Sequence, residues 1–132
     1  MRIPSLLFTV ILALLAVDAT AQDTRRATIY YYGWDVFTRT AMTIADVRAR
    51  YYTKIEIANA DEAVSFASKL VARKMTANAK PEFPDVRLVI DLYSADNKVT
   101  TYFATPFRLY TADGASSVEI DDAFKNKFRI AD

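Results

Sequence analysis

The chain has 132 residues, 52% hydrophobic and 25% charged, a composition that excludes disordered and fibrous classes and is typical of a single globular domain. Its formal net charge is only +1, and no basic stripe stands out, so we expect no nucleic acid as a partner. The sequence contains neither histidine nor cysteine, which excludes thiol nucleophiles, histidine bases and zinc sites built from these residues. We therefore expect no enzyme, no metal site and no cofactor.

The first residues have the pattern of a signal peptide. A positive start at Arg2 precedes the apolar run 6–17, and Ala19 and Ala21 form the small-x-small pattern of a cleavage site. The apolar segment 3–17 would be about 22 Å long as a helix, short of a bilayer core of roughly 30 Å. An uncleaved anchor or a buried helix is the alternative. We expect residues 1–21 to be removed, which leaves one domain, residues 22–132, with no stable membrane anchor.

The absence of cysteine bears on the compartment. An exported protein enters an oxidising environment in which small domains often carry disulfides, and this chain has none. That combination fits a bacterial periplasm better than an animal extracellular space. We expect a periplasmic or secreted protein.

The first predicted strand contains a dense cluster of aromatic residues. Residues 22–26 are polar and are expected to be frayed, whereas residues 29–37 are rich in aromatic and β-branched side chains. Strict alternation places Tyr32 and Trp34 on one face and Tyr31 and Asp35 on the other. We expect the first pair to pack inward and the second to face outward as a binding surface. A buried strand without such a surface is the alternative.

The middle of the chain predicts two helices around a strand. Residues 44–50 read as a short helix, and the period changes to two over residues 51–57, as in a strand with one wet side. Asn59 or Asp61 then caps the main predicted helix, whose apolar positions recur at helical spacing as far as Met75. Residues 76–85 contain Pro81 and Pro84 and read as a loop.

The remaining residues predict further strands and a final helix. Residues 86–93 and 99–105 form a hairpin around a turn at 94–98, Pro106 interrupts the second strand, and residues 107–111 and 117–120 extend the pattern. A last helix is expected over residues 122–128. The predicted fold is α+β: a single curled antiparallel sheet of about four to five strands packed on one long helix, with short accessory helices.

The sequence gives little support for any catalytic group. Ser65 and Lys69 share a helix face, but that face is solvated, and an exposed lysine does not act as a base at neutral pH. Asp121 and Asp122 are expected to cap the last helix rather than bind a cation. The chain has two glycines, too few for a glycine-rich phosphate loop. We predict no catalytic residue.

The remaining functional signal is the supply of tyrosine, tryptophan and arginine. The chain has eight tyrosines and one tryptophan, and these residue types, with arginine, are enriched at protein interfaces. We predict a small exported, non-enzymatic module that binds another protein through a Tyr/Trp/Arg sheet surface, and an inhibitor or immunity-type protein is one concrete version. The alternative is a carrier of a small apolar ligand in a pocket between sheet and helix. The candidate binding residues are Tyr31, Asp35, Arg39, Tyr102 and Arg108.

Overall fold

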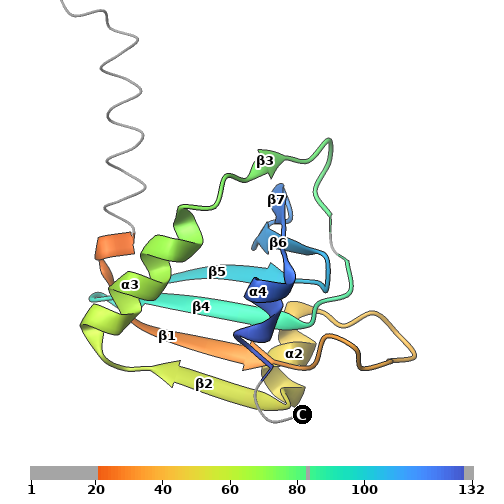
Figure 1. The fold of residues 1–132 in the computed structure, drawn as a ribbon, viewed down its shortest axis with the longest axis horizontal. Helices are drawn as coiled ribbons and strands as arrows, with labels where there is room; N and C mark the ends of the chain where they lie inside the picture. The colour runs from red at the N-terminus through yellow and green to blue at the C-terminus, as the bar shows by residue number, and fades with distance from the viewer. Residues whose placement is uncertain (1–20, 83, 130–132) are drawn as a thin grey trace, which may run out of the picture.

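A computed structural model describes residues 21–82 and 84–129 of the chain (Figure 1). The expected signal peptide lies outside these residues, apart from its last residue, Ala21. Ala21 is buried and packs in the core.

One antiparallel sheet of seven strands runs through the molecule, in the order β2-β1-β4-β5-β6-β7-β3. Every neighbouring pair of strands is antiparallel. The strands are β1 (Thr24–Tyr31), β2 (Thr53–Ile57), β3 (Thr76–Ala77), β4 (Leu88–Ser94), β5 (Val99–Ala104), β6 (Arg108–Thr111) and β7 (Ser116–Glu119).

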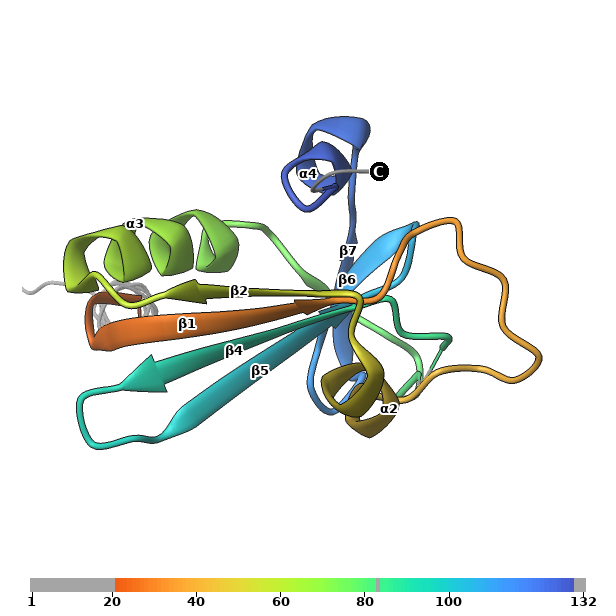
Figure 2. The same cartoon turned by 90° about the horizontal axis from the view of Figure 1, so that it is seen from below.

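Within residues 23–82 and 84–129, which the structure describes, three short helices lie on the two faces of this sheet. They are α2 (Ile44–Arg50), α3 (Ala60–Val71) and α4 (Asp122–Asn126). Figure 2 shows α3 and α4 on one side of the sheet and α2 on the other. Each helix starts at a side-chain cap, and Asp121 caps α4 by accepting a hydrogen bond of 2.8 Å from the Phe124 amide, as expected from the sequence.

The predicted sheet of four to five strands on one long helix is wrong. The sheet has seven strands, and α3, the longest helix in the described ranges, has only 12 residues and ends at Val71. The helical spacing of apolar residues continues to Met75, but Thr76 and Ala77 pair with Ser117 and Ser116 at the far edge of the sheet. The chain must leave the helix before Thr76 to make this pairing, which local spacing does not reveal.

The first strand also lies earlier than predicted. Residues 24–26 were expected to be frayed, yet Thr24 pairs with Ser94 and Arg26 with Tyr93 of β4. The strand ends at Tyr31, because Gly33 has φ +126°, a conformation that L side chains rarely adopt. The alternation assumed over residues 29–37 therefore stops at the glycine.

The two faces of the sheet carry separate hydrophobic clusters. The main core lies beneath α3 and α4 and includes Leu70 and Ile90, both buried between helix and sheet. The second core lies on the α2 side and is smaller. Its buried members are Met42, Val47, Val86, Val89, Phe103 and Tyr110.

One buried and two half-buried tyrosines in these cores are expected to make the folded state less stable at alkaline pH. Burial raises the pKa of Tyr30, Tyr102 and Tyr110 above the ordinary 10.0, and a hydrogen bond to Glu82 adds to the effect at Tyr110. The folded state thus holds these protons more tightly than the unfolded state. Their contribution is complete below about pH 10 and is lost as the pH rises through the folded-state pKa values.

We expect urea unfolding to give a lower free energy of unfolding at pH 11 than at pH 9. Tyr102→Phe, which removes one of the three titrating groups, should make that loss smaller. Equal unfolding free energies at the two pH values would contradict this prediction.

Candidate functional site

The register of the sheet brings three chain segments to one end of the molecule. Thr53 of β2, Tyr31 of β1, Leu88 of β4 and Ala104 of β5 form one row across four strands. The chain leaves β1 and β5 at this row and enters β2 there. The loop 33–43, residues 51–52 and the turn 105–107 therefore emerge at the same end of the sheet, and Figure 2 shows the loop after β1 projecting from that end.

This end carries most of the exposed large hydrophobic side chains. Phe37 is 90% exposed, Phe107 75% and Tyr52 71%. Five of the six such side chains found in the described ranges belong to the three segments, and the sixth, Val99, starts β5 at the opposite end. We call this surface the aromatic end; its members are Val36, Phe37, Tyr51, Tyr52 and Phe107.

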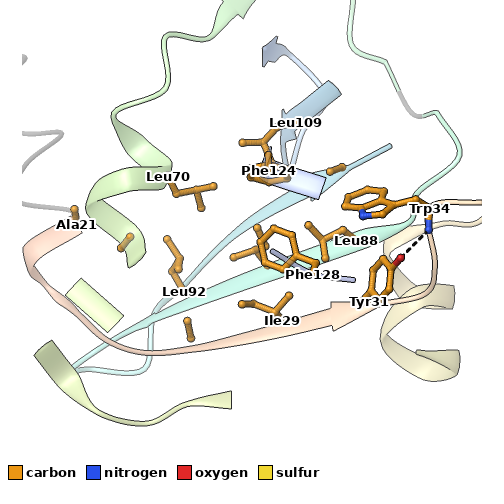
Figure 3. Packing of buried hydrophobic residues seen from close by; sticks show 14 residues of the cluster. Ala21, Ile29, Tyr31, Trp34, Leu70, Leu88, Leu92, Leu109, Phe124 and Phe128 are labelled. Carbon is orange, nitrogen blue, oxygen red and sulfur yellow. Dashed lines mark hydrogen bonds between the residues drawn. The ribbon is translucent and has the colours of Figure 1, made fainter. Parts of the chain in front are cut away.

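The loop 33–43 is held firmly at its start by Trp34, which is 3% exposed and packs in the main core. The Trp34 amide donates to the Tyr31 hydroxyl at 3.1 Å, and the two rings lie 5.6 Å apart (Figure 3). The indole Nε1 donates to the Lys125 carbonyl at 3.0 Å, so α4 fixes the position of the ring. One residue further on, Asp35 and Arg129 form an ion pair of 3.6 Å.

A second set of contacts holds the rest of the loop. The buried Arg87 side chain forms an ion pair of 2.6 Å with Asp85 and donates a hydrogen bond of 3.2 Å to the Thr38 hydroxyl. Asp85 also accepts a hydrogen bond of 2.6 Å from the Met42 amide, and the Val86 amide donates to the Met42 carbonyl. The loop is therefore tied down at both ends, while Phe37 between them points into solvent.

Two of the predicted binding residues belong to this region. Asp35 and Arg39 are both exposed in the loop. Asp35 is paired with Arg129, whereas Arg39 forms no ion pair with any described residue. Arg39 therefore adds a free positive charge beside the apolar side chains of the aromatic end.

Of the other three predicted residues, Tyr31 and Tyr102 do not join this surface, and Arg108 lines a pocket beside Phe107. Trp34 faces inward as expected, but the expectation that Tyr31 faces outward is wrong, because Tyr31 is 3% exposed on the same core side as Trp34. Tyr102 is half-buried against the main core. Arg108 bonds to the Ser117 hydroxyl at 3.0 Å and pairs with Glu119 at 3.7 Å, so it serves the contact between β6 and β7.

Sequence reasoning missed the three most exposed large hydrophobic side chains of the described ranges, Phe37, Tyr52 and Phe107. Phe37 and Tyr52 were assigned to strands, and Phe107 to the continuation of one. Polar neighbours at residues 38–40 and Pro106 directly before Phe107 were the available signals that these aromatics lie in loops and turns.

A polar cluster lies on the same face of the sheet as α2. Asp91, whose side chain is 3% exposed, accepts hydrogen bonds from Arg48 Nε at 3.0 Å and Nη2 at 2.6 Å. The Thr101 hydroxyl also donates to Asp91 at 2.6 Å. The arginine partner of Asp91 thus comes from helix α2 and not from a neighbouring strand. Hydrogen bonding to Asp91 raises the pKa of Arg48, which therefore stays charged.

Other kinds of site find no support in the described ranges. No group of three or more acidic side chains there is placed to hold a metal ion. No helix in that part of the chain combines the length and apolarity needed to cross a bilayer. No protein-family model, curated protein or solved structure matches the chain.

Proposed function

We propose that the chain is a small exported, non-enzymatic module that binds another protein through the aromatic end. The observation that carries the proposal is Phe37, 90% exposed on a loop whose two ends are fixed by buried contacts. An exposed phenylalanine has a cost in water that binding removes, because apolar surface is transferred out of solvent. The proposed interface is therefore the end of the sheet, and not the face of the sheet that was expected from the sequence.

The anchoring of the loop favours binding. A loop ordered before binding loses little conformational entropy on association, so more of the contact energy appears as affinity. Trp34 and Arg87 both hold the loop from inside the protein, and neither side chain is needed on the surface. Phe37 can then act as a rigid anchor, the kind of residue that dominates interface energetics.

The surface also defines the chemistry of the partner. Phe37, Tyr52 and Phe107 require an apolar pocket with aromatic or aliphatic walls. Arg39 is exposed without an acidic partner in the described ranges, and Arg50 is exposed at the end of α2. We infer a folded protein surface with one deep apolar pocket and carboxylates on its rim. An inhibitor or immunity-type protein, which blocks a cleft on its target, fits this description.

The test uses the purified chain with a photo-crosslinking residue at position 37 and, as a matched control, at position 99. A protein captured at position 37 and not at 99 would then be purified for affinity measurements. We expect Phe37→Ala to weaken its binding at least thirtyfold, which corresponds to about 2 kcal/mol or more.

Val99→Ala, which truncates an exposed side chain at the opposite end, should change the affinity less than twofold. Neither variant should shift the melting temperature by more than about 2 °C, because both side chains are exposed. Failure to capture any protein at position 37, or undiminished binding by the Phe37→Ala variant, would contradict the proposed function.

A further inference from the structure

A groove runs between α3 and α4 on the main-core side of the sheet. Its volume is about 350 Å³, within the range of small-molecule sites. Figure 3 shows Leu70 of α3 close to Phe124 of α4. Phe66 lies one turn before Leu70 on α3, and Phe128 one turn after Phe124. These four side chains form an apolar floor.

The rim of this groove is basic. Lys69 and Arg73 border it on the α3 side and Lys127 on the α4 side. Within the described ranges none of these three cations forms an ion pair. Most acidic side chains near helix α4 are already paired with another cation or cap the helix, so they do not neutralise this rim. The one acidic residue of the groove, Glu62, precedes Lys69 by seven residues, about 10 Å along a helix. The positive charge is therefore concentrated at the end of the groove formed by Arg73.

Arg73 joins the charge to the apolar floor. Its guanidinium carbon lies 4.5 Å from the centre of the Phe124 ring, in a cation–π contact. This contact orients the guanidinium while leaving its N–H donors free of any hydrogen bond to described residues. Arginine in such a position binds a carboxylate through two parallel hydrogen bonds. The head of a ligand would therefore lie at Arg73 and its apolar part along Phe66 and Leu70.

We propose that this groove binds a small amphiphilic anion, a carboxylate with an apolar chain of medium length. The chain would lie against Phe66, the one half-buried side chain of the floor, above the buried Leu70, Phe124 and Phe128, and the head group would neutralise Arg73 and Lys127. This proposal is independent of protein binding at the aromatic end, because the two surfaces share no residue. The volume favours a small ligand over a peptide helix, whose diameter alone is about 10–12 Å.

The test is an NMR titration of the purified protein with decanoate, kept below its micelle-forming concentration. We expect saturable shifts at the amides of Leu70, Arg73, Phe124 and Phe128, with few changes at the aromatic end. Decanol, which has the same chain without the charge, should bind at least tenfold more weakly. Raising the salt concentration should weaken decanoate more than decanol, because the contacts at the rim are screened.

The double variant Arg73→Gln, Lys127→Gln should bind decanoate at least tenfold more weakly. Lys98→Gln, which removes an exposed charge on the β4–β5 turn, should leave the affinity within twofold. An unchanged backbone spectrum away from the groove would show that the double variant is folded. If it is not folded, Lys127→Gln alone replaces it, with an expected loss of at least threefold.

Three outcomes would overturn the proposal. They are the absence of saturable shifts at the groove, equal affinity for decanol and decanoate, and undiminished binding by the folded variant. Binding of an acidic amphipathic peptide at these residues, with decanoate excluded, would likewise reject a small ligand in favour of a peptide.

Discussion

Replacing Trp34 with alanine is expected to lower the free energy of unfolding by about 3–5 kcal/mol. The indole is 3% exposed and packs with Tyr31 in the main core, so its removal leaves a large cavity. It also removes the hydrogen bond of 3.0 Å to the Lys125 carbonyl, which links the loop 33–43 to α4. Chemical denaturation monitored by circular dichroism measures the loss.

Two matched variants separate the contributions of Trp34. Trp34→Phe retains much of the buried ring but lacks the indole N–H, so it should lose distinctly less stability than Trp34→Ala. Phe37→Ala, three residues away on the same loop, should lose almost none, because its side chain is exposed. A loss below about 1 kcal/mol in Trp34→Ala would mean that the indole does not hold the loop onto the core.

Trp34→Ala should also weaken partner binding under conditions in which the variant remains folded. The loop would then sample several conformations, and binding would have to order it again. Trp34 itself is buried and cannot contact a partner, so such a loss would report loop order and not a lost contact. Phe37→Ala tests the contact itself, and the two variants together distinguish these two contributions to affinity.

The elements with strong local periodicity were the ones predicted best from the sequence. Strand β4 lies within the predicted range 86–93 apart from Ser94, and α3 begins at Ala60 after the Asn59 cap. Strands β3 and β7 are short and mostly polar, and their pairing joins Thr76 to Ser117. The strand predicted over residues 117–120 corresponds to β7, whereas β3 exists because a distant partner supplies its hydrogen bonds, and the sequence around it predicts a loop.

The candidate site was less predictable for two physical reasons. Alternation correctly placed Trp34 inward, but it assumed a continuous strand and so assigned Tyr31 to the opposite face. The positive φ of Gly33 resets the phase, which brings both rings to the same core. Similarly, strand periodicity cannot identify Arg48 as the partner of Asp91, because helix packing on a sheet is a tertiary contact.

The Arg48–Asp91 pair gives the second large predicted effect. Asp91 is buried in the sheet, and two of its three observed hydrogen bonds to side chains come from Arg48. Arg48→Met would leave a buried carboxylate with only the Thr101 hydroxyl as a side-chain donor. Removing one partner of a buried ion pair typically costs 3–5 kcal/mol. Arg48 is itself 39% exposed, and water can partly replace it, so we expect a loss of about 2–4 kcal/mol.

The double variant Arg48→Met, Asp91→Leu determines whether the cost comes from the unpaired charge. Without a carboxylate there is no charge left to desolvate, and apolar replacements of buried pairs are often neutral. We expect the double variant to recover most of the stability lost by Arg48→Met, as measured by urea unfolding at pH 7. If both variants were equally destabilised, the loss would instead come from the packing of α2 on the sheet. Arg48 would then hold the helix through its aliphatic stem, and Asp91 would be satisfied by Thr101 and solvent alone.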